Sequence, residues 1–246
     1  MKNNILILIS GFLILTSCNN DNDDYTEIIS APNVEATFGS HIDLNNLGNY
    51  ANQATPNYIR KDNSILNPVT DRGATLGRVL FYDTNLSANN TTSCATCHKQ
   101  ENAFSDTEIA SSGANSTTGR HSMRLINSKF SVESKFFWDE RAASLEIQTT
   151  MPIKDHGEMG FSGENGDLSF NDLTTRLEGI GYYKELFHFV FGTEEITEAK
   201  IQFVLAQFIR SIQSFDSKYD AGRALVANDN QPFSNYTAQE NLGKTL

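Results

Sequence analysis

Two cysteines and a histidine stand together in the segment CATCH, residues 94–98. The spacing of Cys94 and Cys97 also fits a redox disulfide or half of a zinc site. A zinc site would need a second Cys/His pair at ligand spacing, and the chain has one further cysteine, Cys18. A redox disulfide leaves His98 without a role. Covalent haem attachment uses all three side chains, because two thioethers hold the haem edge and the imidazole of His98 binds the iron. We therefore expect one haem c on this chain.

Residues 1–17 have the pattern of an export signal. Lys2 supplies a positive start, and the apolar run over residues 5–15 is too short to span a membrane. The run ends in LTSC, which resembles a bacterial lipobox and assigns lipidation to Cys18. The alternative is a chance cysteine in an ordinary signal peptide. We expect a periplasmic protein that is lipid-anchored to a membrane, and an exported chain also suits covalent haem attachment.

The composition limits the kinds of partner that the protein can have. Of the 246 residues, 39% are hydrophobic and 20% are charged, which suits a soluble globular body of one large or two small domains. The formal net charge is -11, and no Lys/Arg cluster stands out, so nucleic acid is not expected as a partner. The acidic surface either steers a basic protein partner or serves solubility alone.

Helical patterns dominate the sequence, and no strand pattern stands out, so we predict an all-α fold. The segment RGATLGRVLFY, residues 72–82, places its apolar side chains on roughly one helical face. Residues 136–152 fit a helix across their middle, and Thr237 with Glu240 forms a capping box that opens a last helix. A longer apolar stripe with helical spacing indicates a helix packed on the core and consists of Ile201, Val204, Leu205, Phe208, Ile209 and Ile212.

A short sequence pattern that occurs twice in the chain bears on the domain organisation. The segment LGRVLF, residues 76–81, precedes the haem motif, and LGKTL, residues 242–246, repeats its pattern. Either the second segment is a terminal helix that docks on the core, or the sequence breaks off just before a second haem module. We favour the break. The expected organisation is a polar tether at 18–45, a haem domain at 46–215 and the opening of a second domain at 216–246, the tether resting on the polar run NNDNDD.

Several stretches together resemble the bacterial di-haem cytochrome c peroxidases. They are LGRVLFYDTNLS (76–87), CATCH (94–98), FFWDERAASLEIQ (136–148) and EMG (158–160). The likeness extends to related di-haem enzymes that oxidise protein side chains. It implies two cytochrome c-like helical domains, with an N-terminal haem where peroxide reacts. It also implies a second haem that receives electrons from a small cytochrome c or cupredoxin. The second Cys-x-x-Cys-His motif is absent from this sequence.

The resemblance assigns roles to four residues. His98 matches the proximal iron ligand, and Glu158 matches the carboxylate that moves protons over the distal face. Gln148 matches a polar residue of the same pocket, and Trp138 matches an aromatic residue between the haems. A buried carboxylate suits proton transfer because burial raises its pKa. Without the family, Glu158 reads as a surface residue, Gln148 as an exposed helix residue and Trp138 as core packing.

The sequence departs from the family pattern at three positions. Many members have a distal histidine sixteen residues after the proximal one, where this chain has Ala114. We therefore expect an open or water-bound sixth iron position that needs no reductive activation. His121 stands where the family usually has a calcium-binding asparagine, and because Ca²⁺ prefers oxygen ligands, calcium is in doubt and His121 is expected to be a structural hydrogen-bonder. Glu140 replaces the glycine of WDGRA, so we expect that turn to differ.

Two classes of function remain open on the sequence. The first is a haem-dependent peroxidase that reduces hydrogen peroxide to water with electrons from a small redox protein. The second is a one-haem electron carrier in which Met159 is the sixth ligand, which would raise the potential and block peroxide. A di-haem oxidase of protein side chains is a variant of the first class, since both enzymes need the same open haem. We favour the peroxidase.

Overall fold

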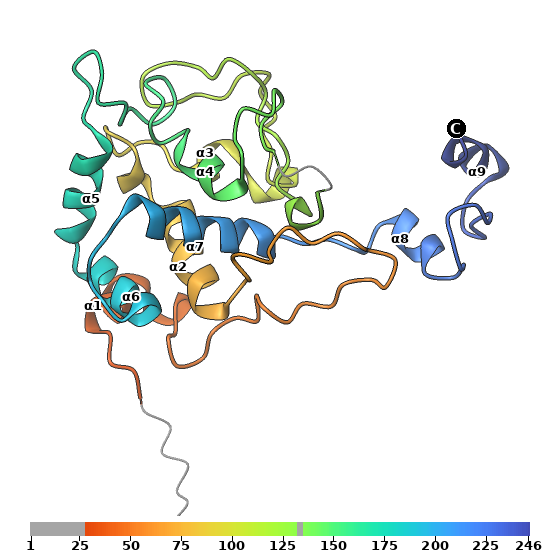
Figure 1. Ribbon diagram of the computed structural model, residues 1–246, viewed down its shortest axis with the longest axis horizontal. Helices are drawn as coiled ribbons and strands as arrows, with labels where there is room; N and C mark the ends of the chain where they lie inside the picture. Colours follow the sequence, from red (N-terminus) through yellow and green to blue (C-terminus); the bar gives the residue numbers. More distant parts are fainter. Residues whose placement is uncertain (1–27, 132–134) are drawn as a thin grey trace, which may run out of the picture.

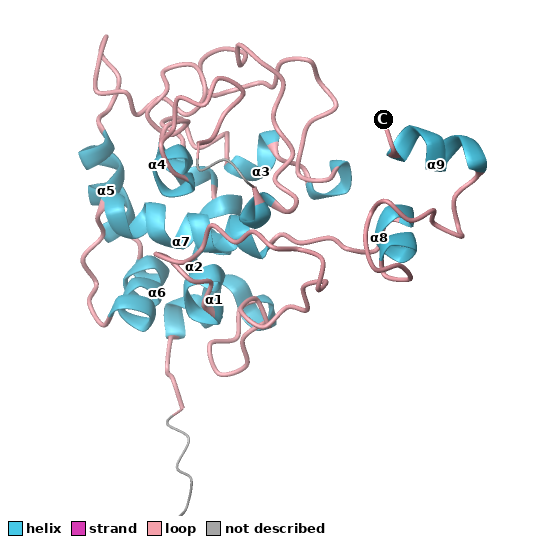
Figure 2. Ribbon diagram, turned by 45° about the vertical axis from the view of Figure 1, so that its right-hand side comes forward, coloured by secondary structure: helices cyan, strands magenta, loops and turns pink. Residues whose placement is uncertain are grey.

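The computed structural model describes residues 28–131 and 135–246, and all of its regular elements are helices (Figures 1 and 2). The predicted signal, Cys18 and residues 18–27 of the predicted tether lie outside the described residues. Within the described ranges there is no named strand, only three isolated bridges, and no helix there is long and apolar enough to cross a membrane. The all-α prediction is confirmed. The helices are α1 (Pro32–Phe38), α2 (Asp71–Tyr82), α3 (Cys94–Cys97), α4 (Leu145–Thr150), α5 (Phe170–Glu178), α6 (Gly181–Phe191), α7 (Glu198–Ser211), α8 (Lys218–Arg223) and α9 (Ala238–Lys244).

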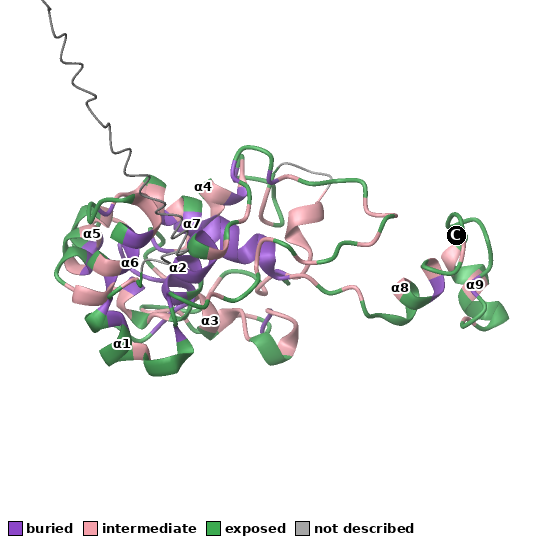
Figure 3. Cartoon of the chain, turned by 90° about the horizontal axis from the view of Figure 1, so that it is seen from below, coloured by how far each residue is buried: buried purple, intermediate pink, exposed green. Residues whose placement is uncertain are grey.

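The core is built around α2 and α7, which are the most buried helices of the fold (Figure 3). Each begins at a threonine cap: the side chain of Thr70 accepts from the Gly73 amide, and that of Thr197 accepts from the Lys200 amide. The two helices cross in close contact, since a β-carbon on Gly77 would lie 2.0 Å from the carbonyl oxygen of Val204. The predicted apolar stripe faces this contact, so its interpretation as core packing is confirmed.

Residues 31–44 belong to the helical body, which corrects the predicted tether and the domain start at 46. Helix α1 packs on α6, and Val34 is only 1% exposed. The carboxylate of Glu185 on α6 accepts from the backbone amides of Asn33 and Val34 at 2.9–3.1 Å, which satisfies the N-terminus of α1. The sequence alone misleads because the segment is polar overall and its few apolar residues show no regular period.

Long irregular segments cover the haem-motif side of the helical core (Figures 1 and 2). The helix expected across residues 136–152 is shorter than predicted and runs only over Leu145–Thr150. Before it, Phe136 and Ala142 form an isolated antiparallel bridge that closes a turn. Two residues of this turn, Phe137 and Glu140, have positive φ angles of 73° and 56°. A turn of this kind interrupts any helix.

Helices α8 and α9 lie apart from the other helices, beyond an extended segment that follows α7 (Figures 1 and 3). The capping box predicted at the start of α9 is present, with Thr237 and Glu240 each accepting from the other's backbone amide. Tyr58 connects α8 to the body, because its hydroxyl donates to Asp220 at 2.5 Å. Leu242 on α9 is 62% exposed.

Candidate haem site

His98 follows the single turn of α3 and has the geometry of an iron ligand. A capping box between Ser93 and Thr96 starts the turn, and the His98 amide donates to the Cys94 carbonyl at 2.9 Å. The ring atom Nδ1 lies 3.0 Å from the carbonyl oxygen of Phe104. A carbonyl can only accept, so Nδ1 carries the proton. Burial lowers the pKa of His98, which favours the neutral ring. In a neutral ring with the proton on Nδ1, Nε2 carries the lone pair that can bind a metal.

Cys94 and Cys97 lie at the wall of the cavity that His98 also lines. Within the described residues neither thiol is in a disulfide. Burial, with a smaller contribution from Cys97, raises the pKa of Cys94 to about 12, and burial likewise raises the pKa of Cys97. Both thiols are therefore neutral, as suits an apolar haem edge.

The cavity next to the haem motif has a volume of about 760 Å³. Its walls are the end of α2, the haem motif, residues 118–128, the turn before α4, and the loop that carries Glu158 and Met159. This volume falls in the range of cavities that hold cofactors. The imidazole of His98 and the two thiols, which form no disulfide among the described residues, line the same space, so the residues present fit a haem c.

Glu158 lines this cavity on a loop that is held at several points. Oδ1 of Asp155 accepts from the amides of Gly157 and Glu158 at 2.8 and 3.0 Å. The amide of Ala114 donates to the Glu158 carbonyl at 2.7 Å. A β-carbon on Gly113 would lie 2.3 Å from the Gly157 carbonyl oxygen, so only glycine permits this approach. Burial and the neighbouring Asp155 raise the pKa of Glu158, and Arg141 partly offsets them. Glu158 is partly buried at the cavity wall.

Ala114 and Met159 differ in how they relate to the cavity. The backbone of Ala114 holds the Glu158 loop, and Ala114 is not among the residues that line the cavity. Met159 does line the cavity, is 3% exposed and packs with the hydrophobic core. Both Glu158, on which the peroxidase depends, and Met159, on which the electron carrier depends, therefore line the same cavity.

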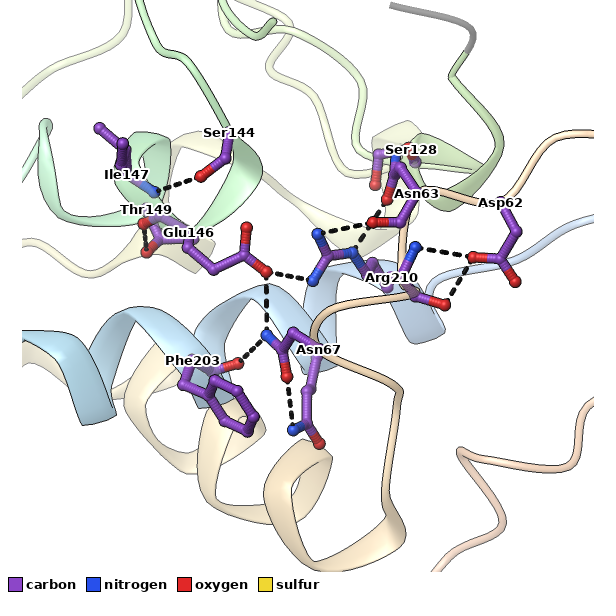
Figure 4. A network of polar contacts seen from close by, with 12 residues as sticks. Asp62, Asn63, Asn67, Ser128, Ser144, Glu146, Ile147, Thr149, Phe203 and Arg210 are labelled. Atoms are coloured by element: carbon purple, nitrogen blue, oxygen red, sulfur yellow. Dashed lines mark hydrogen bonds and ion pairs between the residues drawn. The ribbon is translucent and has the colours of Figure 1, made fainter. Parts of the chain in front are cut away.

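Gln148 lines the cavity from α4, and a polar network fixes this helix on α7 (Figure 4). Glu146 of α4 pairs with the guanidinium of Arg210, whose side chain is 4% exposed. The amide of Asn67 donates to Glu146 and to the Phe203 carbonyl, both at 2.9 Å, and accepts from Gln207 at 2.8 Å. Burial alone would raise the pKa of Glu146, but hydrogen bonds from Arg210 and Asn67 outweigh it and hold that pKa below its usual value.

Trp138 lies at the cavity and is 61% exposed, so its reading as a core residue is wrong. Its indole Nε1–H donates to the His121 carbonyl at 3.1 Å. The ring nitrogens of His121 lie 2.8 Å from the Glu108 carbonyl and 3.1 Å from Oγ of Ser105. His121 is thus a structural hydrogen-bonder, as expected. Among residues 28–131 and 135–246, no group of three or more His, Cys, Asp or Glu side chains could hold a metal ion.

Arg141 is a cavity residue that sequence reasoning did not single out. Its guanidinium stacks on the Phe137 ring, 3.6 Å from the centroid, and donates to Asp139 at 2.9 Å. Asp139 also accepts from Arg120 at 2.9 Å. The segment WDERA contains Arg141, but no spacing rule connects it with Glu158, which is close only in the fold.

An all-helical fold around a cavity that presents a Cys-x-x-Cys-His segment defines the class of cytochrome c-like haem proteins. The comparisons narrow this class. Residues 71–228 match the family described as di-haem cytochrome c peroxidase. The methylamine utilization protein MauG of Methylophilus methylotrophus is 36% identical over 169 residues, covering 68% of this chain and 47% of that protein. The cytochrome c551 peroxidase of Nitrosomonas europaea is 30% identical over 148 residues, covering 60% of this chain and 42% of that protein.

A solved structure also shows similarity to proteins of this kind. A MauG-like protein associated with microbial copper homeostasis superposes with a TM-score of 0.62 at 32% identity, over 73% of this chain and 53% of its own. The chain belongs to the di-haem cytochrome c peroxidase family. It spans about half the length of the relatives it matches.

Proposed function

We propose that the protein is a periplasmic, haem-dependent peroxidase that reduces hydrogen peroxide to water. The observation that carries this proposal is the shared cavity of His98 and Glu158, in which burial raises the pKa of the carboxyl group. Similarity to the cytochrome c551 peroxidase of Nitrosomonas europaea supports the same reaction class. The haem iron, when bound, supplies the binding position for peroxide and the electrons that break its O–O bond.

The side chains around the cavity provide the proton chemistry. The carboxylate of Glu158 takes a proton from the near oxygen of peroxide and returns it to the far oxygen, so that water leaves. Gln148 orients the peroxide through a hydrogen bond and does not titrate. The guanidinium of Arg141 lowers the pKa of Glu158 and so favours the ionised carboxylate, which is the form that takes the proton.

Electrons reach the site from outside the described chain. We propose a small donor, a cytochrome c or cupredoxin, and a second haem in the part of the family fold that this chain does not span. The exposure of Trp138 at the cavity supports a role for this residue in passing electrons to the haem. Lipidation of Cys18 would hold the protein at a membrane. We propose no calcium-binding residues for this chain.

The substitution Glu158→Gln tests the proton role. Amide and carboxyl groups have similar shapes, but an amide cannot carry the proton. We expect peroxide turnover to fall by about 10²–10⁴-fold with unchanged haem content, as for other general acid–base groups. Glu164→Gln is the matched control, because Glu164 lies further along the same loop, is exposed and does not line the cavity. Unchanged turnover in Glu158→Gln would remove this residue from the mechanism.

A second candidate is an electron carrier in which Met159 binds the iron, and the burial of Met159 at the cavity favours it. The optical spectrum of the resting oxidised protein separates the two. The peroxidase requires an open or water-bound sixth position, because peroxide must reach the iron. We expect such a position here because the side chain of Ala114 has no ligating atom. A low-spin spectrum that Met159→Leu converts to high spin would establish the carrier. A low-spin bis-histidine spectrum would contradict both the open position and the methionine ligand.

Similarity to MauG supports a further variant, an oxidase of protein side chains. It would use the same open haem and the same Glu158. Steady-state turnover with hydrogen peroxide and a reduced cytochrome c, compared with single-turnover oxidation of a protein substrate, distinguishes the two. The scavenging peroxidase predicts many turnovers per haem with the reduced cytochrome.

A further inference from the structure

Two adjacent tyrosines on α6 share one carboxylate. The hydroxyls of Tyr182 and Tyr183 donate to the same oxygen of Asp83, Oδ2, at 2.6 and 2.7 Å. These lengths lie in the range of O–H···O hydrogen bonds, and each phenol is the donor. The other oxygen of Asp83 accepts from the amide and side chain of Asn85 at 2.8 and 2.9 Å. Both lone-pair sides of the carboxylate are therefore in use, and the phenols point at a fixed base.

The two rings form a contact pair that leads from the interior outward. Their centroids are 4.6 Å apart. Tyr183 is fully buried, whereas Tyr182 is half-buried. The ring centroid of Tyr182 lies 5.1 Å from that of Phe38 on α1. Burial, with hydrogen bonding to Asp83, raises the pKa of Tyr182, and burial also raises the pKa of Tyr183. Both phenols therefore keep their protons at neutral pH.

The end of α2 connects this pair with the haem cavity. Phe81 lines the cavity, and its ring centroid lies 6.5 Å from that of His98. Two residues later the chain reaches Asp83, the base of the tyrosine pair. Cys94 packs against the hydrophobic core cluster that includes Tyr183. The buried phenol and the haem attachment segment therefore border the same hydrophobic cluster.

We infer that Tyr183 and Tyr182 are a redox-active pair that gives electrons to the oxidised haem site, with Asp83 as the proton acceptor. This inference rests on the proposed function, because peroxide at the haem is the oxidant. Carboxylate hydrogen bonds favour phenol oxidation, since a phenol that loses an electron becomes a strong acid and needs a base within reach.

Each step balances. The phenol of Tyr183 transfers one electron to the oxidised haem site, and its O–H proton moves to Oδ2 of Asp83. The products are a neutral phenoxyl radical and a protonated carboxyl group. Transfer of an electron from Tyr182 then restores Tyr183, which takes back the proton, while Tyr182 releases its own proton to the same oxygen. One electron from a reduced small redox protein, or from an oxidisable side chain of a protein substrate, restores Tyr182 with the proton held on Asp83.

A structural role alone would also explain why α6 is pinned to the end of α2, so the test must detect the radical itself. Haem-loaded protein is mixed with hydrogen peroxide, frozen within milliseconds and examined by electron paramagnetic resonance. We expect a tyrosyl signal that narrows when ring-deuterated tyrosine is incorporated. The signal should be lost in the Tyr182→Phe/Tyr183→Phe double variant and strongly reduced in Asp83→Asn. The asparagine keeps an acceptor oxygen but removes the base.

Tyr82→Phe is the matched control. Tyr82 is 43% exposed, and its ring centroid lies 5.3 Å from that of Phe81. Among the described residues its hydroxyl hydrogen-bonds only to the side-chain oxygen of Gln100, at 3.4 Å. The inference predicts an unchanged signal in this variant. Each single tyrosine variant, with haem content and circular dichroism as fold controls, keeps the test valid if the double variant does not fold. A signal that persists in the double variant, or that is lost in Tyr82→Phe instead, would overturn the inference.

A second oxidant separates this inference from the peroxidase proposal. Photo-oxidised tris(bipyridyl)ruthenium removes electrons from the haem-loaded protein without peroxide. A Tyr182/Tyr183 signal under light but not with peroxide would support the redox pair and contradict the proposed peroxide chemistry. Peroxide turnover without a signal at these tyrosines under either oxidant would leave the peroxidase in place and refute the pair.

Discussion

At the scale of single residues, Glu140 is in a conformation that suits glycine. Its φ of 56° lies in the left-handed region, which costs a non-glycine residue about 1 kcal/mol or more. We expect Glu140→Gly to raise the free energy of unfolding by about 0.5–1 kcal/mol, since the extra flexibility of glycine in the unfolded chain offsets part of the gain. Denaturant unfolding of the haem-loaded protein measures the change.

Glu140→Ala is the control for this turn. Alanine keeps the β-carbon and hence the left-handed cost, while it removes the same carboxylate from the cavity wall. A stabilisation by alanine equal to that by glycine would attribute the effect to the lost charge and contradict the backbone explanation.

The charges beside Glu158 give a second prediction at this scale. In the proposed mechanism ionised Glu158 is the base, so we expect turnover to fall as the pH drops through its raised pKa. Asp155→Asn keeps the oxygen that accepts from the Glu158 amide but removes the negative charge, which lowers the pKa of Glu158 and moves the acid limb of the pH profile to lower pH. Arg141→Gln removes a positive charge and moves the limb to higher pH. Profiles of kcat/KM against pH check both directions, and shifts of the same sign would refute Glu158 as the titrating group.

The site residues that could be predicted from the sequence alone are those that stand next to one another in the chain. Cys94, Cys97 and His98 stand side by side in the chain. Arg141 and Glu158 line one cavity only because of the fold, and the fold likewise brings Asp83 to the two tyrosines almost a hundred residues later. No periodicity or local spacing encodes such pairs, so reasoning from the sequence missed them.

At the scale of secondary-structure elements, the Glu146–Arg210 ion pair holds α4, and therefore Gln148, on α7 (Figure 4). Arg210→Met leaves the partly buried carboxylate without its cation. We expect a loss of about 2–4 kcal/mol in the free energy of unfolding, because an unpaired buried charge is costly. Adding Glu146→Gln should recover much of that loss. Equal stability of the single and double variants, measured by denaturant unfolding, would show that the pair does not act as a unit.

The same pair predicts how stability depends on pH. The folded-state pKa of Glu146 lies below its usual value, so its contribution is present above the unfolded-state pKa and is lost as the pH falls through the folded-state pKa. Wild-type protein should therefore lose more stability on acidification than the Arg210→Met/Glu146→Gln variant. If the wild-type protein and the double variant lost stability equally over that acidic range, the attribution of this pH dependence to Glu146 would be contradicted.

Helices with a regular apolar stripe could be predicted, whereas those held by single contacts could not. The stripe that begins at Ile201 gave α7, and the face of Leu76 to Phe81 gave α2. Helix α1 depends on one buried valine and on the distant carboxylate of Glu185. Helix α4 is short because the backbone turns at Phe137 and Glu140 before it. Both facts arise from tertiary structure and leave no periodic signal.

At the scale of the whole molecule, the structure has a helical part that packs without the cofactor and an irregular part that surrounds the cavity. Leu76, Leu80, Val204 and Leu205 are fully buried between α2 and α7. By contrast, much of the cavity wall comes from residues 118–128 and the turn before α4, where regular hydrogen bonding is sparse. Segments with few backbone hydrogen bonds and few buried contacts open first. A haem in the cavity supplies their missing apolar contacts.

This division predicts what loss of the haem does. Cys94→Ala/Cys97→Ala removes both thioether bonds, so haem is lost on purification. We expect near-native helical circular dichroism, because Leu76, Leu80 and Val204 of the α2–α7 core are buried and do not line the cavity. The Tm should fall, since a ligand that binds only the folded state stabilises it. Limited proteolysis should cut preferentially within residues 99–144. The Cys97→Ala variant keeps one thioether and should lie between the two in Tm. A haem-free protein with the wild-type Tm and no new cleavage there would mean that the irregular part orders without the cofactor.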